Sequence, residues 1–394
     1  MVPAKSIRLR APRAQRDAAS ALLIRIARGE PLAPPDVAAL TDPDMARTFL
    51  TLARFHRVDG LAYEALRSAG AQPDVLQELV TSYDASVHRH ARTLWALSKA
   101  AETLHPLGCR WVVVKGPVLV EYLYWGRPGT RPYFDLDLLV EPRAFGDALE
   151  ALQHDGAELL DRNWAGIAHS MRGEVHLRLA PGVLLDLHWN LIDMHRNAMD
   201  FGTDDLLSRL RVEGIAGVAT PMPDTEDSVL HLAFHAAYSG GDRLLWLKDV
   251  QRAAEVWQPD WEVIEDRAAR ARIAPAVGLI LERARRVLGA DVPPELTLRM
   301  TGQLAARIAG LVDRVSPWQY GLGRFAAPSR ILSRSIGHGP AGAARWVAAR
   351  VLRNLDPWQE RRTSTFTERG GEADKRRYIE SVAAMGRDGD NRRG

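Results

Sequence analysis

Strand-like segments are confined to the middle of this chain of 394 residues, and that confinement narrows the possible folds more than any other feature. Residues 17–108 repeat apolar side chains at the spacing of amphipathic helices, with breaks at Gly29 and near Asp59-Gly60. From Thr225 onward the same helical spacing returns. Any sheet must therefore come from the residues between these two helical regions.

Four runs in the middle region are typical of strands. They are "CRWVVV" at 109–114, "FDLDLLV" at 134–140, "GEVHLRLA" at 173–180 and "VLLDLHWNL" at 183–191. The last two are separated by Pro181-Gly182, which predicts a hairpin turn. These strands are too few and too short for a doubly wound sheet, so a small mixed sheet with helices packed on it is the better prediction.

The predicted fold class is therefore α+β and mostly helical, with a small mixed β-sheet core flanked by helical regions. We expect an N-terminal helical region over 1–108, an α/β core over 109–222, a C-terminal helical domain over 223–355 and a charged C-terminal tail over 356–394. Hydrophobic residues make up 46% of the chain, which is enough for a sizeable core.

Charge and cysteine content exclude some classes of protein. The formal net charge is only +3 and the pI is about 9.1, so nucleic-acid binding is not indicated. Cys109 is the single cysteine, so the chain cannot form an internal disulfide, which fits a reducing cytosol. The basic N-terminus lacks the apolar core of a signal peptide, and no apolar stretch approaches a membrane span. We therefore expect a cytoplasmic protein with no membrane partner.

Three carboxylates lie within the apolar strand-like runs. Asp135 and Asp137 are two residues apart, so both side chains point to one face of a strand, and Asp186 is flanked by leucines in another run. Carboxylates held this close repel one another unless a cation lies between them, and Mg²⁺ prefers oxygen ligands. Three acids on adjacent strands can hold two metal ions for phosphoryl or nucleotidyl transfer. The structural alternative is a turn acid, an acid paired with arginine and an edge-strand acid.

Lys115-Gly116-Pro117 lies where the first strand gives way to a helix. Glycine permits the turn, and proline favours the first helical position. Free backbone N–H groups at such a turn can bind phosphate, and the lysine adds a point charge. Arg131, four residues before Asp135, is expected either to pair with the acids or to bind a phosphate. The alternative is an ordinary loop with a solvated lysine.

The ordered combination "VVVKGPVLVEYLYWGRPGTRPYFDLDLLV", "DLHWNL" and "TEDSVLHLAFHAAYSGGDRLLWLKDVQRAAE" resembles the uncharacterised nucleotidyltransferase family. That family is a branch of the polymerase-β-like nucleotidyltransferase superfamily. The resemblance covers about residues 110–255. It departs from the wider superfamily at Lys115-Gly116, where most members have Gly-Ser.

The resemblance implies a nucleotidyltransferase that moves NMP from an NTP such as ATP to a hydroxyl or phosphate acceptor. Asp135 and Asp137 would bind Mg²⁺ and the triphosphate, and Asp186 would complete the metal site or act as a base. Two Mg²⁺ ions are expected, with Mn²⁺ as a substitute. Lys115, Gly116 and Arg131 would bind the nucleotide. The acceptor is a small molecule, a peptide or a protein that the sequence does not identify.

Other polar residues are weaker candidates. His231 and His235 are spaced as on one helix face, but no third ligand follows, so packing or substrate binding is favoured over zinc. His188, His235 and Asp249 are assigned to a substrate cleft. Two other functions remain open: transfer of a sugar or phosphoryl group on the same scaffold, as in tailoring of natural products, and a non-catalytic binding module.

Overall fold

The computed structural model describes residues 11–192, 202–320, 327–336 and 365–391. The chain forms two compact units, each assembled from three stretches of sequence. The helical unit comprises residues 1–88, 119–133 and 229–343, and the sheet unit comprises 89–118, 134–228 and 344–394. The four continuous ranges expected from the sequence stay a prediction, because this grouping does not show which part folds alone. Residues 356–364 and 392–394 of the expected tail lie outside the described residues.

The main sheet belongs to the sheet unit and has five strands in the order β1-β2-β5-β4-β3. Their bounds are β1 Trp111–Val113, β2 Asp135–Val140, β3 Glu158–Leu159, β4 Glu174–Leu179 and β5 Val183–His188. Strand β2 runs parallel to β5, whereas the other neighbouring pairs are antiparallel. The sheet is therefore small and mixed, as predicted, and β4 and β5 form the hairpin expected at Pro181-Gly182.

One face of this sheet is entirely apolar. Residues at alternate positions of the three central strands supply it: Leu136, Leu138, Val175, Leu177, Leu185 and Leu187, all fully buried. The pairing register places these side chains level with one another across the strands. Because side chains alternate between faces, the remaining positions of the same strands all project from the opposite face.

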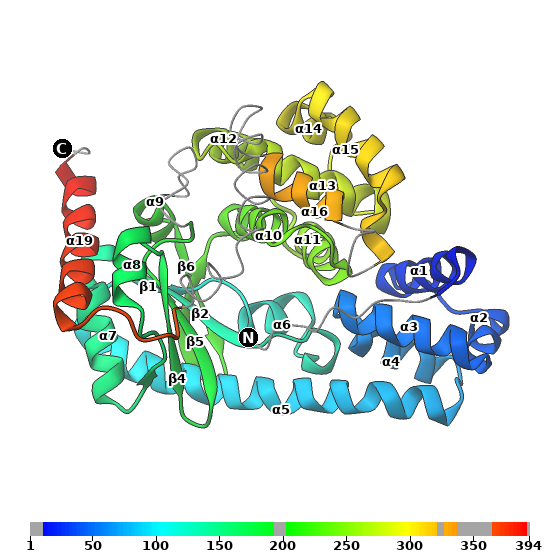
Figure 1. Cartoon of the computed structure of the whole chain (residues 1–394), viewed down its shortest axis with the longest axis horizontal. Coiled ribbons are helices and arrows are strands. Elements are labelled where there is room, and N and C mark those ends of the chain that lie inside the picture. The colour runs from blue at the N-terminus through cyan, green and yellow to red at the C-terminus, as the bar shows by residue number, and fades with distance from the viewer. Residues whose placement is uncertain (1–10, 193–201, 321–326, 337–364, 392–394) are drawn as a thin grey trace. The chain divides into compact units, whose positions relative to one another are not determined.

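Helices of the sheet unit are α7 Phe145–His154, α8 Trp164–Ser170, α9 Thr203–Leu207 and α19 Glu372–Asn391. Figure 1 shows α19, drawn in red, beside α7 and α8, with which it is in contact. A separate hairpin, β6 Leu210–Ile215 and β7 Val218–Pro223, packs its second strand against β1. The C-terminal helix is thus part of the packed unit although it is nearly 200 residues from the central strands in sequence.

The helical unit consists of short helices whose ends are marked in the sequence. Its helices are α1 Arg13–Arg28, α2 Pro34–Ala38, α3 Pro43–His56, α4 Asp59–Ser68, α11 Leu244–Trp257, α12 Trp261–Arg270, α13 Ala274–Leu288, α14 Pro294–Thr301, α15 Gln303–Val315 and α16 Ala327–Ser335. Helix α1 ends at Gly29 with φ 81°. Asp42 caps α3 by accepting from the backbone N–H groups of Asp44 and Met45.

Three helices contribute residues to both units: α5 Pro73–Leu104, α6 Pro117–Leu123 and α10 Thr225–Ser239. The long helical stretch predicted before the first strand corresponds to α5, and the break expected near Asp59-Gly60 falls between α3 and α4. The predicted fold class, α+β and mostly helical around a small mixed sheet, is confirmed. The β6–β7 hairpin is an element that the sequence analysis missed.

Candidate active site

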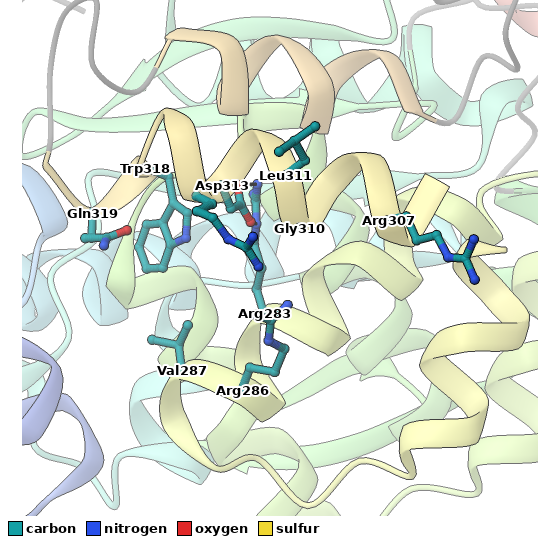
Figure 2. Close-up of a pocket in the computed structure, with 10 residues that line it drawn as sticks. Arg283, Arg286, Val287, Arg307, Gly310, Leu311, Asp313, Trp318 and Gln319 are labelled. Atoms are coloured by element: carbon teal, nitrogen blue, oxygen red, sulfur yellow. Dashed lines mark hydrogen bonds and ion pairs between the residues drawn. The ribbon is translucent and has the colours of Figure 1, made fainter. Parts of the chain in front are cut away.

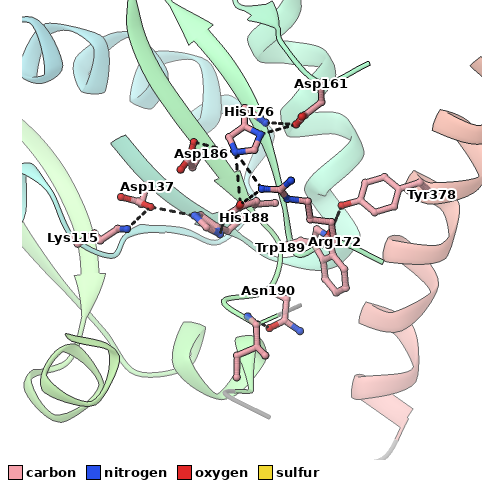
Figure 3. A network of polar contacts seen from close by, with 12 residues as sticks. Lys115, Asp137, Asp161, Arg172, His176, Asp186, His188, Trp189, Asn190 and Tyr378 are labelled. Atoms are coloured by element: carbon pink, nitrogen blue, oxygen red, sulfur yellow. Dashed lines mark hydrogen bonds and ion pairs between the residues drawn. The ribbon is translucent and has the colours of Figure 1, made fainter. Parts of the chain in front are cut away.

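The second face of the central sheet gathers the polar side chains of three strands. Asp137 on β2 lies directly opposite Asp186 on β5, and Asp186 in turn lies opposite His176 on β4. One step further along the strands, His188 lies opposite Glu174. A single pleat therefore brings acids and imidazoles from β2, β5 and β4 side by side (Figure 3). Two of the three predicted acids are direct cross-strand neighbours.

Asp137 is the most enclosed member of this polar face, with 1% of its surface exposed. Its Oδ1 atom lies 3.0 Å from Lys115 Nζ and 3.3 Å from His188 Nε2. Its Oδ2 atom is buried and has no hydrogen-bond partner among the described residues. A buried carboxylate oxygen without a partner is costly, so this oxygen is available to a ligand.

The protonation of Asp137 and Lys115 follows from this pairing. Burial on its own would raise the pKa of Asp137, but Lys115 and His188 outweigh it and hold that pKa well below the usual value. Burial would lower the pKa of Lys115, yet Asp137, Asp135 and Asp186 raise it above the ordinary value. The two side chains are therefore both charged at neutral pH.

Asp186 has the opposite environment. Burial, followed by repulsion from Asp137, Asp135 and Glu174, raises its pKa to about 7. The Nε2 atom of His176 lies 3.9 Å from Asp186 Oδ1, which is too far for a hydrogen bond. A carboxyl group with this pKa is poised between its two protonation states near neutral pH, and a bound cation would favour the ionised one.

Strand β4 adds two residues that the sequence analysis did not single out. Glu174 Oε2 lies 3.3 Å from His188 Nδ1, so His188 bridges Glu174 and Asp137. Burial opposes ionisation of Glu174, but His188 and Arg172 lower its pKa to about 2. Asp137 and Glu174 raise the pKa of His188 to about 9 against the effect of burial. The alternation of "EVHLRL" carried the signal, since its polar positions share one face.

His176 is oriented by Asp161. The Asp161 Oδ2 atom accepts the backbone N–H of His176 at 2.7 Å and lies 2.9 Å from its Nδ1. Because an ionised carboxylate only accepts, Nδ1 carries a proton. Nε2 lies 3.4 Å from Arg172 Nη2 and 3.9 Å from Asp186 Oδ1. The ring of Phe366 lies 5.4 Å from that of His176, and Phe366 is 49% exposed. A residue of the C-terminal segment therefore borders the polar face.

A second contact from the C-terminal segment supports the end of β5. Trp189, which follows His188, donates its indole N–H to the hydroxyl of Tyr378 at 2.7 Å. Tyr378 lies on α19, is fully buried, and donates to the backbone carbonyl of Arg172 at 2.5 Å. Figure 3 shows Tyr378 reaching from α19 toward Trp189 and Arg172. Helix α19 thus ties together the strand ends that carry His188 and Glu174.

Lys115 and Gly116 form the turn expected between a strand and a helix. Gly116 has φ 71°, a left-handed conformation that favours glycine, and Pro117 is the first residue of α6. Helix α6 has seven residues, so its dipole adds little to an anion site. The ammonium group of Lys115 is the stronger electrostatic feature of this turn, and a phosphate contact for Lys115 and Gly116 stays a prediction.

Arg131 and Asp249 are partners in the helical unit. Two guanidinium nitrogens of Arg131 donate to the two oxygens of Asp249 at 3.0 and 2.9 Å, and Tyr124 donates to the same carboxylate at 2.8 Å. All three side chains are buried. Nη1 of Arg131 is buried without a hydrogen-bond partner in the described part of the chain, so one donor remains for a ligand. Phosphate binding by Arg131 and a cleft position for Asp249 stay predictions.

The two histidines of α10 lie with their ring centroids 6.0 Å apart, and His235 also contacts the ring of Trp246 at 6.1 Å. Among the described residues, the group of side chains that could share a metal ion consists instead of Asp137, Asp186 and His188. The ligand atoms of that group lie within 4.8 Å of one another. The assignment of His235 to a substrate cleft stays a prediction.

The residues of the polar face fit a divalent cation. Asp137 offers its unpartnered buried oxygen, Asp186 is destabilised as an anion by neighbouring acids, and both effects are relieved by a cation. Asp135 lies two residues from Asp137 on the same face, close enough to raise the pKa of Asp186, although it is outside the group that could share one ion. His188, which the sequence analysis had assigned to the cleft, belongs to the same group, but its ring nitrogens face Asp137 and Glu174 and it would have to lose a proton before it could bind a cation.

None of the helices in the described part of the chain combines the length and apolar character needed to cross a membrane. Comparison with curated proteins and with solved structures gave no significant match. Comparison with family models matched the uncharacterised nucleotidyltransferase family over residues 42–289, which is more than half of the chain. The match includes the acids and histidines of the polar face, which is called the acidic face below, but not Phe366 or α19. The protein therefore belongs to this nucleotidyltransferase family and is an enzyme that transfers phosphorus-containing groups.

Proposed function

We propose that this protein transfers a nucleotidyl group from an NTP to a hydroxyl or phosphate acceptor, with Mg²⁺ held by Asp135, Asp137 and Asp186. The observation that carries the proposal is the cross-strand pairing of Asp137 with Asp186. Asp137 has a buried oxygen without a hydrogen-bond partner among the described residues, and burial together with repulsion from neighbouring acids raises the pKa of Asp186 to about 7. Such repulsion is costly in a protein without a bound cation and is useful in one that binds metal and triphosphate.

In the proposed reaction an acceptor oxygen forms a bond to the α-phosphorus while the bond from that phosphorus to the pyrophosphate oxygen breaks. The acceptor proton leaves with a base, and pyrophosphate departs. Bound Mg²⁺ would neutralise the triphosphate and stabilise the charge that develops during this displacement. The protein holds the reacting groups in line and keeps its own charges in fixed positions.

The side chains around the acids have distinct roles in this proposal. His188 and Glu174 fix the orientation of Asp137, since His188 bridges the two carboxylates at 3.3 Å on each side. Lys115 supplies positive charge for the triphosphate. His176, oriented by Asp161, lies 3.9 Å from Asp186 and borders the proposed metal site. Asp186 has two candidate roles, since it can complete the metal site or accept the proton of the acceptor.

The two roles of Asp186 predict different results for Asp186→Asn. If Asp186 is a metal ligand, the variant loses affinity for the Mg²⁺–NTP complex. If Asp186 is the base, binding stays near the parental value while turnover falls by at least about a hundredfold. Parental turnover together with parental binding would remove Asp186 from the active site.

The transfer itself is tested with labelled donors. The full-length protein is incubated with each of the four NTPs, and separately with NDP-sugars, in the presence of Mg²⁺ and pooled small-molecule and peptide acceptors. Intact-mass analysis is expected to show the mass of an NMP added to an acceptor. Addition of a sugar or a phosphoryl group instead would show that the scaffold carries one of the alternative transfers. Asp44→Asn, which alters an exposed acid of the helical unit, is the control for Asp186→Asn.

A further inference from the structure

A pocket of about 670 Å³ lies within the helical unit, formed by α13, α15 and the turn that follows α15. Its lining includes Arg283, Arg286, Arg307, Leu311, Arg314 and Trp318. Figure 2 shows Arg283 and Arg286 of α13 and Arg307 of α15 among the residues that line this pocket, with Trp318 on the side away from Arg307. No residue assigned to the proposed reaction is in the lining, so the pocket requires a separate explanation.

The charge of the pocket is positive after internal pairs are removed. Arg283 donates to both oxygens of Asp313 at 3.0 and 2.7 Å, so these two lining residues neutralise each other. Arg307 and Arg314 are exposed and form no ion pair with any described residue. The Nε atom of Arg286 is 3.9 Å from a Glu282 oxygen that Arg285 already engages at 2.9 Å. Arg307 and Arg314 are therefore unpaired, and Arg286 has only a long contact with a carboxylate that it shares with Arg285.

Gly310 has no packing reason to be glycine. It lies inside α15, where glycine costs about 1 kcal/mol relative to alanine, and a Cβ atom built on it would meet nothing within 4 Å. No neighbouring backbone approaches it closely. The missing side chain instead leaves open the wall of the pocket between Arg307 and Arg314, which is where a ligand would lie.

An exposed apolar stripe runs along the same helix. Leu304, Ile308, Leu311 and Val315 are 73%, 45%, 58% and 71% exposed. Their spacing of four, three and four residues places them on one side of α15. Leu311 belongs to both the stripe and the pocket lining. Continuous exposed apolar surface beside unpaired positive charge is typical of an interaction site.

We propose that the pocket and the apolar stripe of α15 together form a docking site for an acidic peptide segment that carries apolar side chains. Charge complementarity selects this occupant, because the unpaired Arg307 and Arg314, together with the weakly paired Arg286, match carboxylates, which guanidinium groups bind through two parallel hydrogen bonds. The stripe matches the apolar side of an amphipathic helix, a common way of recognising peptides. This inference is independent of the proposed reaction.

Fluorescence anisotropy with two labelled peptides tests the proposal on the full-length protein. Both peptides are sixteen-residue amphipathic helices with one leucine face, and they differ only in carrying glutamate or lysine on the flanks. The glutamate peptide is expected to bind at least tenfold more tightly, and added salt is expected to weaken that binding. Arg307→Glu/Arg314→Glu is expected to reverse the preference. The control Arg47→Glu/Arg67→Glu makes the same change in charge at exposed sites of the helical unit. This control is expected to leave the preference for the glutamate peptide unchanged.

Gly310→Leu provides a second test that keeps every charge. It fills the pocket wall and is expected to weaken binding of the glutamate peptide at least fivefold, while circular dichroism shows parental folding. Equal binding of the two peptides, or an acidic preference that survives Arg307→Glu/Arg314→Glu, would overturn the proposal. The proposal would also be overturned if an oligonucleotide of the same charge displaced the labelled glutamate peptide as well as the unlabelled glutamate peptide does, since the oligonucleotide lacks the leucine face. Self-association that Leu311→Ser abolishes would show that a second copy of the chain is the occupant.

Discussion

At the scale of single residues, the pKa values of Asp186 and Lys115 depend on the charges of the acidic face. Asp186 has a pKa raised to about 7 by burial and by its acidic neighbours, whereas the pKa of Lys115 is raised by the same acids against the effect of burial. One side chain is therefore strained by the cluster of carboxylates and the other is stabilised by it. Each gives a prediction of its own.

The raised pKa of Asp186 makes stability depend on pH. A carboxyl whose folded-state pKa exceeds its unfolded value binds its proton more tightly when folded, so its contribution to stability is full below about pH 4 and is lost as pH rises through about 7. In metal-free solution we expect the melting temperature to fall between pH 5 and 8. His188, with a pKa of about 9, adds to the fall at the upper end of this range.

Asp186→Asn removes the titrating group. The variant is expected to show a smaller fall in melting temperature between pH 5 and 7 than the parent protein. At pH 7.5 without metal, the variant is expected to melt a few degrees above the parent protein. Differential scanning fluorimetry in EDTA measures both. If parent and variant show the same pH profile, Asp186 does not have the raised pKa on which the account depends.

Lys115 is expected to act on the donor rather than on the acceptor. Its ammonium group lies at the turn before α6, 3.0 Å from Asp137, and is a point charge for a triphosphate held at the acids. We predict that Lys115→Met raises KM for the NTP at least tenfold, a loss of about 1.4 kcal/mol. KM for the acceptor should be unchanged. Steady-state kinetics that show a change in the acceptor KM alone would contradict this role.

Much of the acidic face could be predicted from single residues. Asp135, Asp137 and Asp186 stood out because acids within apolar strand runs are rare, and Lys115-Gly116 stood out because it joins a strand to a helix. Glu174 and His176 were missed because charged residues that alternate with apolar ones are also typical of a strand with one solvated face. Only the register of β4 against β5 shows that this polar face borders the acids.

At the scale of elements, helix α19 is the part of the sheet unit that the sequence predicted least well. Its Arg-, Asp- and Gly-rich composition suggested a surface position, yet it contacts α7 and α8 and buries Tyr378 completely. Amino-acid composition is an average over the whole helix, whereas packing depends on the few residues of one face. The β6–β7 hairpin was missed for a related reason, since its strands are half exposed and lack a continuous apolar run.

Tyr378→Phe tests whether α19 supports the acidic face. The change removes the hydroxyl that accepts from Trp189 and donates to the Arg172 carbonyl, and it leaves a buried indole N–H with one partner fewer. We expect a loss of about 1–3 kcal/mol in the free energy of unfolding. Turnover should also fall several-fold, because the ends of β4 and β5 carry Glu174 and His188.

Chemical denaturation and turnover assays measure the two effects of Tyr378→Phe. Tyr63→Phe, at a partly buried tyrosine of the helical unit, is the matched control and should change neither quantity by as much. Turnover that stays parental in a destabilised Tyr378→Phe protein would confine α19 to a purely structural role, and parental stability would show that the two hydrogen bonds contribute nothing.

At the scale of the whole molecule, family membership and the geometry of the sheet point to the same site. The family match covers 42–289 and identifies a nucleotidyltransferase. The pairing of β2 with β5 then gives that family assignment a physical site, because it places Asp137, whose buried Oδ2 has no hydrogen-bond partner among the described residues, directly opposite Asp186. The central claim is that this acidic face binds Mg²⁺ together with an NTP.

The most direct test is the change in melting temperature of the full-length protein when Mg²⁺ and each of the four NTPs are added, alone and together. A ligand that binds only the folded state raises the melting temperature by mass action. We predict a rise with Mg²⁺ and at least one NTP together, and none for Asp135→Asn/Asp186→Asn, which should be at least as stable as the parent without ligand because repulsion is relieved. A parental rise in this variant, or no rise in the parent protein with any of the four NTPs, would contradict the claim.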